Sequence, residues 1–324
     1  RVLIAPPEAR RVGQWLRASG ARLDQVAVVA ELERRQGAAM LQLNPAPGDL
    51  ALLQYTSGST GDPKGVVLTH ANLLANIRAM CQAIDVKPDD VFVSWLPLYH
   101  DMGLIGAWLG SLYHGVPVAI MSPLRFLARP ANWLRAIHRH RGTLTAAPNF
   151  AFDLCLNKIT DEEIEGVDLS SLRMAANGAE PVSPATIRRF IARFAGHGFK
   201  ASAMAPVYGL AECSVGVAFP PLGREPLIDR IDRRALEEEG EARPAAAGDG
   251  TVEFVACGRA LPGHEVRVVD AAGRETPERR QGRLQFRGPS ATSGYFRNPE
   301  KTAELFDGEW LETGDLAYMV GGDI

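Results

Sequence analysis

The chain has 324 residues, of which 46% are hydrophobic and 23% charged, and this composition suits one large core or two smaller ones. Its formal net charge of −3, with arginine and lysine scattered along the chain, gives no electrostatic basis for binding nucleic acid or an anionic membrane. The four cysteines lie far apart in the sequence, which argues against a disulfide framework or a zinc site and fits a reducing cytoplasm.

Short apolar runs alternate with amphipathic helical patterns through the first two-thirds of the chain. This alternation predicts an α/β fold with a mostly parallel sheet flanked by helices. Helices are expected to begin near Thr69, Pro130 and Ser183, which suit cap or first-turn positions. Strands are expected at 50–55, 66–68, 91–93, 144–146 and 174–176.

Residues 102–121 carry no formal charge and are long enough to span a bilayer. Several glycines interrupt the segment, and Gly115 and Pro117 divide it into a helix-length piece and a short apolar run. We therefore expect a buried helix followed by a strand at 118–120, and no membrane span.

Beyond about residue 215 the pattern changes to β segments separated by Gly and Pro. Strands are expected at 252–255, 266–269 and 284–286, after a long polar connection at 222–250 with a short helix at 234–239. We expect residues 1–215 to form the α/β core, and residues 216–324 to form that connection and a smaller distorted barrel or antiparallel subdomain. The chain starts at Arg1 and stops at Ile324 without completing a domain, so we expect it to be a piece of a longer protein.

The most informative segment is T-S-G-S-T-G-D-P-K-G at residues 56–65, between two apolar runs. Glycines let backbone N–H groups approach an anion closely, hydroxyls add donors, and Lys64 supplies a mobile positive charge. The loop therefore suits a polyphosphate, although it does not fit the Walker pattern because Pro63 occupies a key position. Composition alone would equally allow a polar hairpin turn.

Four other segments carry groups that a nucleotide site could use. An aromatic ring and a carboxylate lie four residues apart at 208–212, and 313–315 could present a carboxylate at the end of a strand. Residues 177–181 follow a strand and precede a helix, where open α/β sheets bind ligands, and 95–103 contains His100. Taken singly, these segments also read as a surface turn, an Asx-turn, a plain loop and a structural histidine.

The order of these motifs decides between the readings. The phosphate loop, P-L-Y-H-D-M-G, N-G-A-E-P, Y-G-L-A-E, R-G-P-S…S-G-Y and T-G-D follow one another as in the adenylate-forming superfamily, over residues 50–318. The amino-acid sequences at 96–103, 147–152 and 172–181 resemble those of fatty acyl-AMP ligases. That resemblance implies attack of a fatty carboxylate on ATP, release of pyrophosphate, and transfer of the acyl group to the phosphopantetheine thiol of an acyl carrier protein.

The resemblance also implies roles for individual residues. His100 would lie near the acyl carboxylate or the α-phosphate, Glu212 would bind Mg²⁺, and Asp315 would bind the ribose hydroxyls. The β- and γ-phosphates would contact Thr56, Ser57, Gly58, Ser59, Thr60, Gly61 and Lys64. The adenine pocket would contain Asn177, Gly178, Ala179, Glu180, Tyr208 and Gly209.

Two features depart from this family pattern. Ala211 stands where many relatives have a threonine, so a hydroxyl contact to the α-phosphate is missing or supplied elsewhere. The mobile C-terminal domain, with its catalytic lysine, has no counterpart in this chain. Apolar residues of an acyl tunnel are expected to include Trp108, Phe150 and Phe152.

Three alternatives remain open at this point. An acyl-CoA synthetase would share the first half-reaction, and the long 222–250 segment argues against it. A peptide-synthetase adenylation domain is disfavoured by Y-H-D-M-G at 99–103. A nucleotide- or acyl-adenylate-binding module without turnover would be a function of another class.

Overall fold

The computed structural model describes residues 2–34, 43–56 and 63–324. The chain divides into two compact units, Arg1–Pro45 and Ala46–Ile324. In the first unit, β1 (Val2–Ala5) pairs in parallel with β2 (Gln25–Val28). The intervening helix α1 (Arg10–Ala18) makes this a small βαβ unit, followed by α2 (Val29–Glu33).

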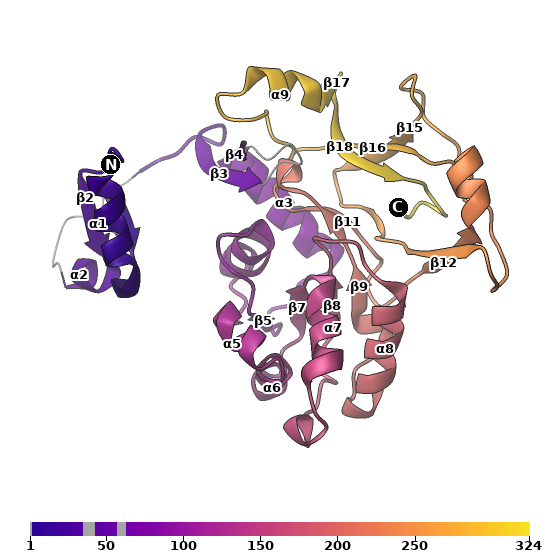
Figure 1. Cartoon of the computed structure of the whole chain (residues 1–324), viewed down its shortest axis with the longest axis horizontal. Helices are drawn as coiled ribbons and strands as arrows, with labels where there is room; N and C mark the ends of the chain where they lie inside the picture. The colour runs from indigo at the N-terminus through magenta and orange to yellow at the C-terminus, as the bar shows by residue number, and fades with distance from the viewer. Residues whose placement is uncertain (1, 35–42, 57–62) are drawn as a thin grey trace. The chain divides into compact units, whose positions relative to one another are not determined.

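A five-stranded parallel sheet forms the centre of the second unit, in the order β6-β5-β7-β8-β9 (Figure 1). Its strands are β5 (Phe92–Ser94), β6 (Val118–Ile120), β7 (Leu144–Ala147), β8 (Met174–Asn177) and β9 (Met204–Pro206). Every residue of β7, β8 and β9 is buried, as expected for parallel strands covered on both faces. The predicted α/β class is confirmed.

An aromatic core packs between this sheet and its helices. Ring contacts run from Trp133 through Phe152 to Phe190, with centroids 5.4 and 5.0 Å apart. Ser183 caps the helix that begins at Pro184, because its side chain accepts a hydrogen bond from the Thr186 N–H, as its sequence position predicts. The helices are α5 (Pro123–Ala128), α6 (Ala131–His140), α7 (Asn149–Lys158) and α8 (Pro184–Phe194).

The predicted phosphate loop connects two paired strands. β3 (Leu50–Thr56) and β4 (Lys64–Thr69) are antiparallel, and Thr56 pairs with Lys64 at the loop's base. Thr69 then begins α3 (His70–Ala83) with a capping box, in which its side chain accepts from the Asn72 N–H. The two predicted strands and the helix after them are confirmed, while residues 57–62 lie outside the described residues.

The uncharged segment at 102–121 folds as a π-helix (Met102–Leu109), then α4 (Gly110–His114), then β6. Gly115 ends the helical part with a left-handed φ of 68°, which explains why the helix stops there. Within the described ranges, no helix combines the length and the apolar character needed to cross a bilayer.

Antiparallel strands dominate the chain after β9. One small sheet contains β10 (Tyr208–Gly209), β11 (Gly216–Phe219) and β14 (Arg259–Ala260). A second small sheet contains β12 (Ile228–Asp232) and β13 (Thr251–Val255). A four-stranded sheet contains β15 (Glu265–Val269), β16 (Gly282–Arg287), β17 (Phe306–Asp307) and β18 (Trp310–Ala317), with α9 (Pro299–Leu305) preceding β17. Short 3₁₀ turns lie at Pro7–Ala9, Glu162–Ile164, Ala195–His197, Ala201–Ala203 and Ala211–Cys213.

The 222–250 connection is more ordered than its composition indicates. It contains strand β12, which the sequence analysis did not predict, and a π-helix at Ala235–Glu239, where a short helix was predicted. Arg230 on β12 pairs with Glu253 on β13 at 2.7 Å, so cross-strand charge pairing stabilises a strand of low apolar content. The predicted domain division near residue 215 stays a prediction.

Candidate active site

A cavity of about 440 Å³ lies between helix α3 and the parallel sheet. Residues two apart on a strand share a face, so Leu144 with Ala146 and Met174 with Ala176 present one apolar wall. The facing wall comes from the C-terminal part of α3, through Met80, Cys81 and Ile84. Phe92, Val116 and Phe219 are among the other apolar residues of the lining.

A buried ion pair lies beside the apolar part of this cavity. Asp90 is only 2% exposed and accepts from Arg173 Nε and Thr143 Oγ1 at 2.7 Å each, and from the Lys87 N–H at 2.8 Å. Arg173 also donates to the carbonyl of Ile84 at 2.6 Å. These contacts join the end of α3 to the starts of β5, β7 and β8, whose next residues line the cavity. The network therefore fixes the spacing of the apolar walls.

The other part of the cavity is polar and is lined by Thr56 and Lys64, the described residues at the two ends of the predicted phosphate loop. Lys64, at the start of β4, and Glu212, in the 3₁₀ turn after β10, both line it. Tyr295 connects them, because its hydroxyl donates to Glu212 Oε1 at 2.7 Å and lies 3.5 Å from Lys64 Nζ. The structure thus brings a cation, a carboxylate and a tyrosine together from segments far apart in the sequence.

Tyr208 and Asp315 also meet, through a 2.5 Å hydrogen bond from the tyrosine hydroxyl to Asp315 Oδ2. Burial and then this hydrogen bond raise the pKa of Tyr208, so its hydroxyl stays a donor. The predicted adenine-stacking ring and the predicted ribose-binding carboxylate are therefore neighbours. Tyr208 lines both the main cavity and a second cavity of about 520 Å³, which Asp315 also lines.

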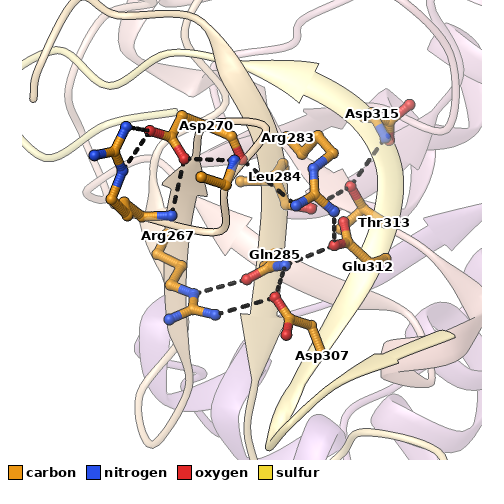
Figure 2. Close-up of polar contacts among 11 residues, drawn as sticks. Arg267, Asp270, Arg283, Leu284, Gln285, Asp307, Glu312, Thr313 and Asp315 are labelled. Carbon is orange, nitrogen blue, oxygen red and sulfur yellow. Dashed lines mark hydrogen bonds and ion pairs between the residues drawn. The ribbon is translucent and has the colours of Figure 1, made fainter. Parts of the chain in front are cut away.

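The Asp315 motif is not the strand-end turn that the sequence analysis expected. It lies inside β18, at a register shift where Gln285 pairs with Glu312 but Arg283 pairs with Leu316. Figure 2 shows Thr313 Oγ1 donating to the Leu284 carbonyl and accepting from the Asp315 N–H, at 2.9 and 3.1 Å.

Charged side chains of neighbouring strands surround this bulge. Gln285 is fully buried and donates to Glu312 at 2.6 Å and to Asp307 at 3.0 Å (Figure 2). Arg267 in turn donates to Gln285 Oε1 at 2.7 Å. The satisfied network holds β16 against β17 and β18, and so fixes the backbone that carries Asp315.

The N-G-A-E-P segment lies at the carboxyl end of β8, as predicted. Asn177 is fully buried and its amide lies 3.3 Å from Asn149 Oδ1. Glu180 accepts from the Phe150 N–H at 2.5 Å, so its carboxylate binds the first turn of α7 in this structure. Ala179 has a left-handed φ of 67° and lines both cavities.

His100 lines the polar part of the main cavity with its side chain 49% exposed. Its Nδ1 lies 2.8 Å from Asp101 Oδ1, and the hydrogen bond to that carboxylate raises the pKa of His100. A protonated imidazolium in this position would attract an anionic substrate. His100 is thus a half-exposed residue of the cavity lining, and its part in a reaction stays a prediction.

The three predicted acyl-binding residues lie outside the lining of the main cavity. Phe152 is fully buried in the aromatic core between Trp133 and Phe190, while Trp108 and Phe150 are 40% and 43% exposed. None of the three is among the cavity-lining residues of the described chain. The sequence identified apolar residues correctly, but helix periodicity alone does not say which face meets a cavity.

The remaining predicted residues divide into two groups. Thr56, Gly209 and Ala211 line the main cavity, and Gly178 follows β8. A Cβ at Gly209 would lie 1.9 Å from the Val215 carbonyl, so only glycine fits there. Ser57, Gly58, Ser59, Thr60 and Gly61 lie outside the described residues.

Sequence reasoning missed two parts of the site. Tyr295 belongs to the S-G-Y motif, which placed it in the family order without giving it a role. The cavity wall of Met80, Cys81 and Ile84 was assigned to the apolar face of a helix, and that face does point inward. The signal was present, but it did not distinguish a packed core from a cavity wall.

Glu212 suits a Mg²⁺ ion that arrives with a nucleotide. Over the described residues, no group of three or more His, Cys, Asp or Glu side chains forms a metal cage. Mg²⁺ is commonly held by one or two carboxylates together with substrate phosphates. Glu212 lines the cavity with Oε1 already bound by Tyr295, and among the described residues none bonds to Oε2, which could meet such an ion.

Known proteins resemble this chain closely. A medium-chain-fatty-acid–[acyl-carrier-protein] ligase of Teredinibacter turnerae is 40% identical over 294 residues, which are 86% of this chain and 46% of that protein. A long-chain-fatty-acid–AMP ligase of Mycobacterium marinum is 38% identical over 300 residues, or 86% of this chain and 51% of that protein. The chain spans about half the length of these curated relatives.

Solved structures agree with this similarity. A structure from a study of fatty acyl-adenylate ligases of E. coli and L. pneumophila superposes with a TM-score of 0.93 at 36% identity, over 99% of this chain and 58% of that one. An adenylation domain of a keto acid-selecting module, bound to a keto acyl adenylate, gives 0.89 at 32% identity, over 99% and 59%. Residues 11–296 match the family of AMP-binding enzymes, and the chain belongs to that family.

Proposed function

We propose that this chain is the nucleotide- and acyl-binding part of an enzyme that activates a fatty acid. In the reaction, a carboxylate oxygen of the fatty acid attacks the α-phosphorus of ATP, and the bond from that phosphorus to the bridging oxygen breaks. Pyrophosphate leaves and an acyl-adenylate forms. The phosphopantetheine thiol of an acyl carrier protein then gives up its proton and attacks the acyl carbonyl, so that a thioester forms and AMP leaves.

One observation carries the proposal. A single cavity has apolar walls between α3 and the sheet, and a polar part that Lys64, His100 and Glu212 line. An aliphatic chain in the apolar part would place its carboxylate toward these charged groups. Both reactants are anions, so the site must neutralise charge before the bond forms.

The residues divide this work between them. Lys64 would contact the phosphates, and the imidazolium of His100 would attract the acyl carboxylate. Glu212 would hold Mg²⁺, which when bound neutralises phosphate charge and stabilises the leaving pyrophosphate. Tyr208 would stack on adenine and Asp315 would accept from the ribose hydroxyls, after their mutual hydrogen bond opens. No side-chain nucleophile is needed, because the fatty carboxylate itself attacks.

The acceptor is proposed to be a carrier protein, and not coenzyme A. The segment 222–250 is an ordered part of this chain, through β12 and its pairing with β13. Relatives named as acyl-carrier-protein ligases support the same acceptor. We also propose that the protein works in the cytoplasm, since all four cysteines are free thiols. A nucleic-acid partner is not proposed.

Calorimetry with a non-hydrolysable dodecanoyl-sulfamoyl adenosine tests the proposal on the chain itself. We expect tight binding, and much weaker binding of an aminoacyl-sulfamoyl adenosine. Preference for the aminoacyl compound would move the chain to peptide-synthetase chemistry, and binding of neither by the folded chain would refute the proposal. Turnover of fatty acid, ATP and carrier protein would then be measured in the parent enzyme.

The metal role has a separate test. Glu212→Gln should weaken Mg²⁺-dependent ATP binding at least about tenfold and leave the sulfamoyl analogue unaffected, because the analogue lacks the β- and γ-phosphates. Glu238→Gln is the matched control, since Glu238 is exposed and paired with Arg234. Equal Mg²⁺ dependence in both variants would contradict the assignment.

The cavity wall has its own test. Ile84→Trp would fill the apolar part, so affinity should fall more for a dodecanoyl than for a hexanoyl analogue. Each methylene is worth roughly 1–3 kcal/mol in an apolar pocket. The control is Phe150→Trp, outside the cavity lining, which should not change the chain-length preference. An unchanged preference in Ile84→Trp would exclude this cavity as the acyl site.

A further inference from the structure

The segment 292–296 binds both elements that carry the charged groups of the site. It extends the hairpin as a neighbour of β4, since the Phe296 N–H donates to the Gly65 carbonyl at 2.7 Å and the Val67 N–H donates to the Gly294 carbonyl at 3.0 Å. The Thr292 N–H also donates to the backbone carbonyl of Glu212 at 2.8 Å. Tyr295 is therefore held between the strand that begins with Lys64 and the turn that carries Glu212.

The hydroxyl of Tyr295 fixes one oxygen of the Glu212 carboxylate. The bond to Oε1 is 2.7 Å long, and Tyr295 is only 8% exposed. In the described part of the chain, no hydrogen bond is made to Oε2. An outer-shell donor of this kind orients a metal-binding carboxylate.

The ring of Tyr295 acts on Lys64 in a different way. Lys64 Nζ lies 4.7 Å from the ring centroid, within the range of a cation–π interaction. Its distance to the hydroxyl oxygen is 3.5 Å, longer than an ordinary hydrogen bond. The ring face therefore provides the main contact to Lys64, while the hydroxyl serves Glu212.

We propose that Tyr295 is a positioning residue, which holds the Glu212 carboxylate by its hydroxyl and the Lys64 ammonium by its ring, so that metal and phosphates meet a preformed site. This inference rests on the proposed function of the same site. It gives the two halves of one side chain separable effects, one on the metal and one on the phosphates.

Substitutions separate the two effects. Tyr295→Phe keeps the ring and removes the hydroxyl, so the Mg²⁺-dependent part of ATP affinity should fall about tenfold while ATP binding without Mg²⁺ stays unchanged. Tyr295→Leu removes both, so ATP binding without Mg²⁺ should fall as well. Both are measured by calorimetry on the whole chain, with and without Mg²⁺, and circular dichroism checks that each variant is folded.

Two controls make the outcome decisive. Tyr113→Phe removes a comparable bond, which Arg78 Nε donates to the Tyr113 hydroxyl at 2.7 Å outside the linings of both cavities, and should change nothing. In a Glu212→Gln background, Tyr295→Phe should have little further effect on Mg²⁺ dependence, because the two residues act as one unit.

Each result has one meaning. If the unsubstituted chain shows Mg²⁺-dependent ATP binding and Tyr295→Phe matches Tyr113→Phe, this inference is wrong while the proposed function stands. Tighter Mg²⁺ dependence in Tyr295→Phe would also overturn it, since the hydroxyl would then compete with the ion. If the unsubstituted chain binds no ATP, the proposed function fails, and this inference fails with it.

Discussion

Replacing Asp90 with Asn should destabilise the larger unit and disturb the cavity at the same time. The carboxylate is 2% exposed and accepts from Arg173, Thr143 and the Lys87 N–H. In the Asn variant one oxygen becomes an NH₂ group, which would face donors that now have no acceptor. Arg173 would lose its counter-charge while its side chain is 24% exposed.

The magnitude follows from this geometry. Breaking a buried ion pair from one side typically costs 3–5 kcal/mol. Arg173 is partly solvated and keeps the carbonyls of Ile84 and Asp85 as acceptors, so we expect the low end, about 3 kcal/mol. The affinity for a dodecanoyl-sulfamoyl adenosine should fall too, because the network joins the elements that form the apolar walls.

The pH dependence has a definite sign. Burial favours the neutral acid, but hydrogen bonds led by the one from Arg173 outweigh it and lower the pKa of Asp90. A lowered folded-state pKa gives stability that is present above the unfolded value, near 3.9, and is lost as the pH falls through the folded value. The advantage of the unsubstituted chain over Asp90→Asn should therefore be full at pH 7 and shrink below about pH 4.

Urea unfolding followed by tryptophan fluorescence measures the difference. Asp161→Asn is the matched control, because Asp161 is 92% exposed and its pair with Arg193 is 3.3 Å long, and this substitution should change little. A loss below about 1 kcal/mol for Asp90→Asn, or a loss that does not depend on pH, would refute the reasoning.

Two further predictions concern titrating groups. NMR titration should give His100 a pKa above 6.5, and Asp101→Asn should lower that pKa, because the hydrogen bond to Asp101 raises it. The stability that this hydrogen bond adds is full below the unfolded-state pKa of His100 and is lost as the pH rises through the folded-state pKa. An unshifted pKa of His100 would contradict this prediction. Burial raises the pKa of Cys81 to about 11 and that of Cys213 to about 12. At pH 8 both thiols should therefore react with a disulfide reagent far more slowly in the folded chain than in the chain unfolded by urea. Equal rates would show that the two thiols are accessible in the folded chain.

Local sequence signals predicted the elements well because they depend on neighbouring residues. Thr69 and Ser183 cap their helices through hydrogen bonds to residues three positions away, and the buried strands β7 and β8 are mostly apolar. The hairpin around the phosphate loop followed from two apolar runs at a short distance. The order of motifs along the chain then led to the family.

Local sequence patterns predict structure less well where the neighbours of a residue come from distant segments of the chain. The alternating pattern at β12 is low in apolar content, and its stability depends on charge pairs with β13 and with Arg279. The T-G-D motif looked like a turn because Gly and Asp favour turns, yet pairing with β16 places it in a strand. Phe152 packs in the aromatic core, because α7 turns that face toward Trp133 and Phe190.

By itself, the sequence determined the α/β class, the phosphate hairpin, the helix caps and the set of polar residues that a nucleotide site would use. Only the tertiary structure decided which of these meet. Tyr295 reaches Glu212 across 83 residues and Lys64 across 231, and no local periodicity encodes contacts of that range. The same holds for the cavity, since its walls come from many segments. Among them are α3 and three strands of the parallel sheet, whose spacing is set by packing and by the buried pair of Asp90 and Arg173.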